Sequence, residues 1–157
     1  MAEMKWLTDL IEERKTKEEA DRAKAKAQTE EYKTKKEEVQ GKWSQIVQSM
    51  IVPVLSEVER NFKRTEYRCE TNVEHRTDFH IHKHITGKVQ LSITFPSKRQ
   101  HIMLLSSSDY EEVVHISFDS SPPDNMQTKE IKFDELSQDR IEAEVKLFIE
   151  KVFKIFN

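Results

Sequence analysis

The chain has 157 residues, of which 35% are charged, and a formal net charge of −3. This length predicts one compact domain with an extension. The slightly acidic balance argues against a duplex nucleic-acid binder, which normally carries a basic excess. The single cysteine, Cys69, cannot form an intramolecular disulfide and fits a reducing compartment. Since no segment is apolar over enough residues to span a bilayer, we expect a cytoplasmic protein.

The N-terminal region is rich in charges of both signs. Residues 12–38 contain nine acidic and nine basic residues and no Leu, Ile, Val, Met, Phe or Trp. Good helix formers dominate this stretch, and opposite charges recur four residues apart, as in Glu13 and Lys17. Such pairs support a helix that is polar all round. The sequence therefore predicts a charged helical arm over residues 1–42 and a separate domain over residues 43–157.

Large apolar residues precede the charged stretch. They share one face of the predicted helix: Trp6, Leu7, Leu10 and Ile11. Leaving these side chains in water would be unfavourable. We therefore predict that they contact a protein partner, a second copy of the chain, or the chain's own sheet. Contact with a membrane surface is disfavoured, because the helix has no strong basic face.

The predicted domain begins and ends with an amphipathic helix. Apolar residues recur at helical spacing from Trp43 to Phe62 and from Ile141 to Phe156. Pro53 predicts a kink in the first helix, because proline removes one main-chain hydrogen bond. Asp134 or Ser137 is suited to cap the second helix.

Between these helices the apolar period changes to two, which is typical of strands. Strands are predicted at residues 66–73, 79–85, 88–95, 100–106, 112–118 and 127–133. Short connections and one apolar face indicate an antiparallel meander. The expected fold class is α+β, with about four to six strands, both amphipathic helices on one sheet face, and the charged helical arm.

The register of the sheet depends on its turns. A three-residue hairpin at Ile85–Gly87 and a four-residue turn at Pro96–Arg99 would place three apolar residues on the outer face: Met103, Leu105 and Val113. An exposed apolar patch of this kind is typical of a contact surface. The alternative is that the N-terminal segment or a loop covers it. A slip of one residue would reverse every face.

Residues 80–84 read His-Ile-His-Lys-His. On a strand, alternate residues share a face, so His80, His82 and His84 would lie about 7 Å from neighbour to neighbour. Two imidazoles at this spacing can share a divalent metal ion such as Zn²⁺, although no third ligand is indicated. The alternative is a solvated histidine face that titrates near neutral pH. No other cofactor is indicated.

Catalytic motifs are absent from the sequence. Gly41 and Gly87 are the only glycines and lie too far apart for a phosphate-binding loop. The serines at 106–108 lack the flanking glycines of a nucleophile elbow. Cys69 lies on a predicted strand and is expected to be a core thiol. An enzyme is therefore disfavoured.

Two kinds of function remain. The first is a non-catalytic protein-interaction or assembly module that uses the helical arm and the outer sheet face to contact a protein partner or a second copy of the chain. The second is a small-molecule or metal-binding domain with a histidine-lined face. Secretion chaperones also contain small acidic α+β domains, but no motif supports more than this analogy of architecture. RNA contact through the sheet is disfavoured, since the predicted outer face carries no aromatic residue.

Overall fold

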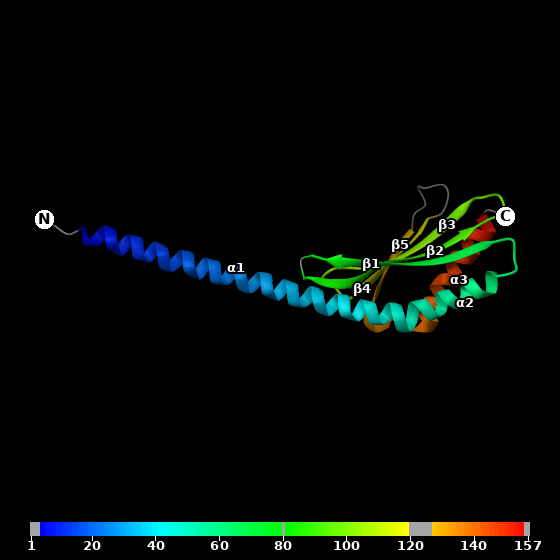
Figure 1. Cartoon of the computed structure of the whole chain (residues 1–157), viewed down its shortest axis with the longest axis horizontal. Coiled ribbons are helices and arrows are strands. Elements are labelled where there is room, and N and C mark those ends of the chain that lie inside the picture. Colours follow the sequence, from blue (N-terminus) through cyan, green and yellow to red (C-terminus); the bar gives the residue numbers. More distant parts are fainter. Residues whose placement is uncertain (1–3, 80, 120–126, 156–157) are drawn as a thin grey trace. The chain divides into compact units, whose positions relative to one another are not determined.

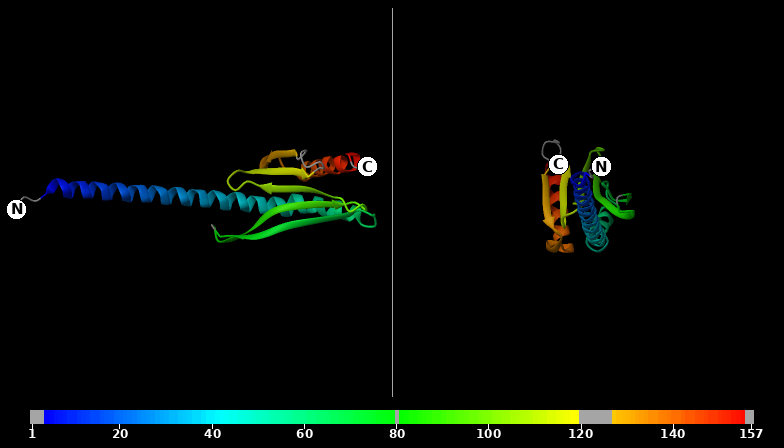
Figure 2. Two further views of the ribbon diagram at one scale, coloured as in Figure 1. Left: turned by 90° about the horizontal axis from the view of Figure 1, so that it is seen from above. Right: turned by 90° about the vertical axis from the view of Figure 1, so that its left-hand side faces the viewer.

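The computed structural model describes residues 4–79, 81–119 and 127–155 (Figures 1 and 2). The chain divides into two compact units, residues 1–35 and residues 36–157. Helix α1 (Lys5–Ile46) contributes to both units. The boundary between the units thus lies N-terminal to the domain boundary predicted after residue 42.

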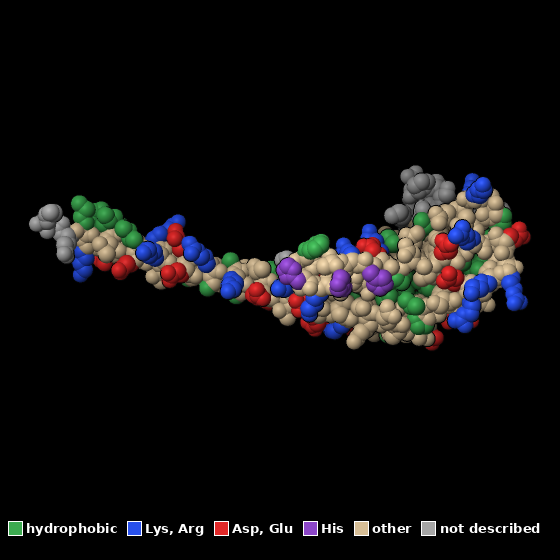
Figure 3. Space-filling model, viewed as in Figure 1, with side chains coloured by type: hydrophobic (Ala, Val, Ile, Leu, Met, Phe, Trp, Pro, Cys, Tyr) green, Lys and Arg blue, Asp and Glu red, His purple; other side chains and the backbone are tan. Residues whose placement is uncertain are grey.

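The first unit is a helix held by local interactions. All side chains from Met4 to Tyr32 are exposed. Basic and acidic side chains alternate along this helix (Figure 3), and the guanidinium of Arg14 pairs with Glu18 at 3.2 Å. The hydroxyls of Thr16 and Thr29 donate hydrogen bonds to carbonyls four residues earlier. The predicted N-terminal helix is therefore confirmed.

The helical run of the second unit is interrupted once. After α1 come a π-helical turn, η1 (Val47–Ile51), and helix α2 (Val52–Phe62), with Pro53 in the first turn of α2. In a continuous α-helix the carbonyl of Ser49 would accept the missing N–H of Pro53. Instead, this carbonyl accepts a hydrogen bond from Nε2 of Gln138 at 2.8 Å. The interruption expected at Pro53 thus takes the form of a π turn just before it.

Five antiparallel strands follow in one sheet, in the order β1-β2-β3-β4-β5. Their bounds are Arg68–Asp78 (β1), Lys83–Thr94 (β2), Gln100–Ser107 (β3), Val113–Asp119 (β4) and Gln127–Lys132 (β5). The short 3₁₀ helix η3 (Phe133–Glu135) and helix α3 (Gln138–Ile155) complete the second unit. Ser137 caps α3, because its hydroxyl accepts the main-chain N–H of Arg140 at 3.1 Å. The predicted α+β meander with flanking helices is confirmed.

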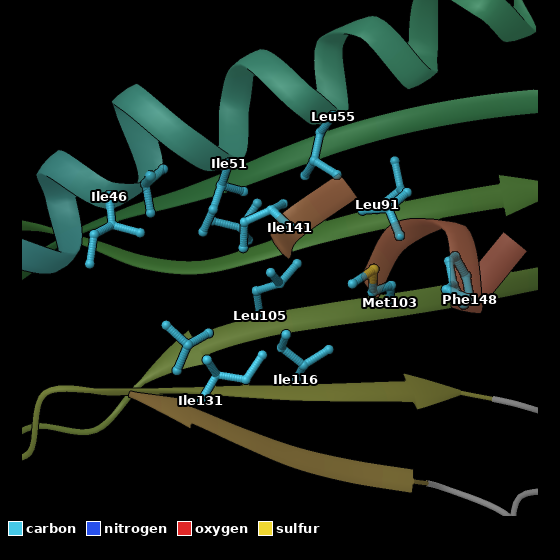
Figure 4. Close-up of a cluster of buried hydrophobic side chains, with 14 of the residues drawn as sticks. Ile46, Ile51, Leu55, Leu91, Met103, Leu105, Ile116, Ile131, Ile141 and Phe148 are labelled. Atoms are coloured by element: carbon cyan, nitrogen blue, oxygen red, sulfur yellow. The ribbon is translucent and has the colours of Figure 1, made fainter. Parts of the chain in front are cut away.

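Helices α2 and α3 cover one face of the sheet, and the core lies between them and the strands (Figure 4). The interior consists of side chains that are at most 2% exposed, among them Ile51, Leu55, Leu91, Met103, Leu105, Ile116, Ile131, Ile141 and Phe148. Every second residue of β2, β3 and β4 enters this core, as the pleat of a strand requires. The opposite face of the sheet is the outer face.

The first hairpin differs from its predicted form. Strand β2 runs through Gly87 without a turn, and the carbonyl of Gly87 accepts the indole N–H of Trp43 at 2.9 Å. β1 ends instead at Asp78 and β2 begins at Lys83, and His82, just before β2, has a φ of 54°. A Cβ added at 87 would lie 2.9 Å from Cδ of Glu74, an exposed side chain that would have to shift. The glycine thus marks a close approach and not a turn.

The second hairpin corrects the predicted register. Phe95 and Lys98 form a turn closed by an N–H to carbonyl hydrogen bond of 2.8 Å, and Lys98 has a φ of 70°. The loop therefore has three residues ending in a left-handed one, and not four. As a result Leu91 pairs with Met103 and Val89 with Leu105.

The predicted outer patch is therefore wrong. Met103 and Leu105 are fully buried in the core, and Val113 is only 8% exposed. The outer face of β3 carries Ile102 and Leu104 instead, both half-buried. The physical reason is the period of two, by which one residue of slip exchanges the two faces.

Candidate interaction surfaces

The first unit carries an exposed row of apolar side chains near its N-terminal end, which we call the N-terminal stripe (Met4, Trp6, Leu7, Leu10 and Ile11). These side chains are between 40% and 63% exposed, and they form the hydrophobic cluster beside the grey residues in Figure 3. Residues three and four apart lie on one helical face, so Arg14 and Lys17 continue the stripe in the following turns. Glu18 and Asp21 follow on the same face by the same spacing, so the apolar stripe is followed first by two basic and then by two acidic residues.

The second unit has a groove between α2 and α3 with a volume of about 450 Å³. We call it the α2–α3 groove. Its apolar lining consists of Pro53, Val54, Val58, Phe62 and Ile149, and its polar lining of Glu57, Asn61, Gln138 and Glu142. All the apolar members except the exposed Pro53 are half-buried. The groove therefore leaves part of its apolar surface in water.

The amphipathic pattern of α2 explains this groove. Leu55 points to the sheet and is fully buried, while Val54 and Val58 lie on the flank of the helix that faces α3. An apolar arc this wide exceeds what the sheet alone can cover. Sequence periodicity placed all of these residues in the core, because it cannot indicate the lateral spacing of two helices.

The outer sheet face is mainly polar. Ile102 pairs across the sheet with Ser92, and Leu104 pairs with Gln90 on one side and Ser117 on the other. Two half-buried aliphatic side chains among small polar ones form a smaller apolar surface than the N-terminal stripe.

His82 and His84 do not share a strand face. His84 lies in β2 and is exposed, with Nδ1 3.0 Å from the hydroxyl of Thr77. His82 lies in the turn before β2, and His80 lies outside the described residues. Within the described ranges, no three His, Cys, Asp or Glu side chains are grouped to hold a metal ion. A metal site that includes His80 stays a prediction.

A smaller pocket of about 300 Å³ lies beside His84, between α1 and β2. We call it the His84 pocket. It is lined by Glu37, Gln40, Gly41, Ser44, Gln45, Ile81, Lys83, His84 and Ile85. An ion pair of 3.3 Å between Lys83 and Glu37 lies at this pocket. Its polar groups come from both the helix and the hairpin.

Polar side chains of residues 36–42 in α1 bind the end of β1 and the loop between β3 and β4. The ammonium of Lys36 lies 2.6 Å from the carboxylate of Asp78, and both side chains are at most 12% exposed. The hydrogen bond with Asp78 raises the pKa of Lys36 above its ordinary value of 10.5. Gln40 contacts Asp109, and Lys42 pairs with Glu112. These contacts explain why the second unit begins at Lys36.

Cys69 is a core thiol, as predicted. It lies in β1 and is 8% exposed. Burial raises its pKa to about 12, and the carboxylates of Glu59 and Glu70 add to the effect. The thiol is therefore protonated at neutral pH.

No protein-family model, curated protein or solved structure matches this chain. Among the described residues, no helix is long and apolar enough to cross a bilayer. Function is therefore inferred from the residues and their arrangement.

Proposed function

We propose that this protein is a non-catalytic association module whose N-terminal stripe binds a protein surface. The observation that carries the proposal is the exposure of the stripe, between 40% and 63% for each of its side chains. Clustered exposed apolar residues mark protein contact sites. A helix that presents such residues at helical spacing is a common ligand for a groove on a partner.

The rest of the first unit supports this role. From residue 12 onward it contains no large aliphatic side chain, so it adds length without a second apolar surface. At about 1.5 Å per residue, the helix of residues 5–35 spans roughly 46 Å. A charged helix of this kind suits a spacer that stays soluble and carries a binding segment at its end.

The outer sheet face is the weaker of the two proposed contact surfaces. With Met103 and Leu105 in the core, its apolar part is reduced to Ile102 and Leu104, both half-buried. We therefore assign the main contact to the stripe and a supporting contact to the sheet.

A comparison of two double variants tests the role of the stripe. Leu7→Gln with Leu10→Gln removes apolar side chains from the stripe, while Asp9→Gln with Glu12→Gln makes the same number of changes on the opposite helical face. The tagged chain is purified, and the proteins that co-purify with it are identified; a copy of the chain with a second tag is present, so that self-association is also detected. The bound proteins should be lost in the first variant and kept in the second. Equal retention by both variants would refute the proposal.

The second candidate function is small-molecule binding in the His84 pocket. The observation that favours it is a volume of about 300 Å³ with polar groups on two elements, which is at the lower end of the range for ligand sites. Gly41 offers a specific block, because a Cβ added there meets nothing within 4 Å. A fragment that raises the Tm of the wild type should not do so in Gly41→Leu. Fragments that raise both Tm values equally would reject this pocket.

A further inference from the structure

We infer that the α2–α3 groove of one copy receives the N-terminal stripe of a second copy. This inference rests on the proposed function and names the surface that the stripe binds. It draws on three properties of the described residues: the length of the two apolar rows, their charge, and their exposure.

The two rows match in length. Val54, Val58 and Phe62 follow one another at intervals of four along α2, which corresponds to roughly 12 Å of helix. The stripe extends from Met4 to Ile11, which corresponds to roughly 10 Å. A helix laid between two others buries its apolar row against both, as in known complexes of a helix with a groove.

The charges of the two surfaces are opposite. Two exposed carboxylates, Glu57 and Glu142, line the groove, and Glu57 forms an exposed ion pair of 3.2 Å with Arg60. Arg14 and Lys17 are the first charged residues after Ile11 on the face of the stripe, and Glu18 follows them on that face. The existing pair of Arg14 with Glu18 has side chains that are 72% and 50% exposed, so little stability is lost when Arg14 exchanges this partner. Such complementarity favours one orientation of the helix in the groove.

Both halves of this contact are present in the same sequence, which is why we assign the groove to a second copy. A foreign helix would have to reproduce an apolar row followed by basic residues. Two copies that exchange their stripes make two identical contacts and form a closed dimer. This arrangement covers both half-exposed apolar surfaces at once.

Charge exchange tests the contact without touching buried residues. Glu57→Lys with Glu142→Lys should raise the dissociation constant of the dimer by at least about tenfold, measured by sedimentation velocity. Arg14→Glu with Lys17→Glu should do the same. Mixing these two variants should restore a heterodimer, because both of its contacts then pair opposite charges. Asp134→Lys with Glu135→Lys makes the same charge change outside the groove and should leave the dimer unchanged.

The alternatives give different results. A wild-type chain that stays monomeric at every concentration would overturn the inference, while the stripe could still bind a foreign protein. A dimer that is lost on Leu7→Gln with Leu10→Gln but unaffected by either charge variant would also overturn it, because the stripe would then bind elsewhere. A dimer that is unaffected by the stripe variant, together with unchanged co-purification, would refute the proposed function as well.

Discussion

Residues 5–35 and residues 36–62 are both helical, but different forces hold them. In the first region the pair of Arg14 and Glu18 has side chains that are 72% and 50% exposed, and such pairs contribute about 0.2–0.5 kcal/mol each. In the second region Trp43 is 1% exposed, and Ile51 and Leu55 are fully buried. Burial of one such side chain contributes about 1.5–3 kcal/mol.

This difference explains where the helix tolerates irregular residues. Residues 12–35 contain no glycine or proline, because a helix without tertiary contacts depends on the propensity of each residue. The second region includes Gly41, a π turn and Pro53. Packing against the sheet and the hydrogen bond from Gln138 compensate for these breaks. Tertiary contact thus permits sequences that local preference alone would not hold in a helix.

The largest expected difference in stability comes from replacing a leucine by alanine, once in the core of the second unit and once in the N-terminal stripe. Leu105→Ala should lower the free energy of unfolding by about 2–5 kcal/mol, because it leaves a cavity in the core. Leu10→Ala, at a side chain that is 54% exposed, should change it by no more than about 0.5 kcal/mol in the monomer. Urea unfolding followed by tryptophan emission measures both values, because Trp43 is 1% exposed in the folded state whereas Trp6 is already 63% exposed.

Leu104→Ala provides the matched control for the register. Leu104 is half-buried on the outer face, so its loss should destabilise clearly less than the loss of Leu105. If Leu104→Ala proved the more damaging of the two, the four-residue turn expected from the sequence would be favoured over the observed one.

A charged pair in each region gives the next contrast. Lys36→Met leaves Asp78 without its ammonium partner at a site where both side chains are at most 12% exposed, and should cost about 1–3 kcal/mol. Arg14→Met should cost at most about 0.5 kcal/mol. Differential scanning calorimetry of the two variants, done at a concentration where the chain is monomeric, compares them directly.

The pH dependence of the Lys36 effect has a definite sign. The pKa of Lys36 is raised in the folded state by its hydrogen bond with Asp78. The stabilisation is therefore complete below the ordinary lysine value of 10.5 and is lost as pH rises through the raised pKa. The difference between wild type and Lys36→Met should be constant from neutral pH to about 10 and shrink as pH rises through the raised pKa. A difference that already shrinks between pH 7 and 9 would assign the stabilisation to another group.

The break at Pro53 provides a smaller effect. Gln138→Ala removes the hydrogen bond to the Ser49 carbonyl and should cost about 0.5–1.5 kcal/mol. In a Pro53→Ala background the new main-chain N–H can bind this carbonyl, so the cost of Gln138→Ala should fall. A double-mutant cycle by urea unfolding measures the coupling. If the free-energy costs of Gln138→Ala and Pro53→Ala simply added, the Ser49 carbonyl would not need the hydrogen bond from Gln138.

The smallest effect on the domain is expected from the first unit. Ala23→Gly with Ala27→Gly should weaken the helix locally by about 1 kcal/mol per residue. The thermal midpoint reported by Trp43 should stay the same as in the wild type. Part of the helical circular dichroism signal should be lost at a lower temperature than in the wild type. If both signals shifted together, the two regions would form one cooperative unit.

Local periodicity determined much of this protein from the sequence alone. The helices, the strands from Gln100 onward and the buried Cys69 all follow from the spacing of apolar residues. Capping preference reduced the N-cap of α3 to Asp134 or Ser137, and the structure shows Ser137. The cluster of Trp6, Leu7, Leu10 and Ile11 was also evident from the sequence, since it lies before a stretch without large aliphatic side chains, but its exposure comes from the structure. That it binds a partner remains a prediction.

Tertiary structure decided the register and the shape of the surfaces. Lys98 and His82 adopt left-handed conformations that cannot be predicted from their residue types. Gly87, which does suggest a turn, lies inside β2. One residue in a turn changes the face of every residue in the next strand, and this moved Met103 and Leu105 into the core. The α2–α3 groove depends on the distance between two helices. The spacing of apolar residues within either helix cannot predict this distance.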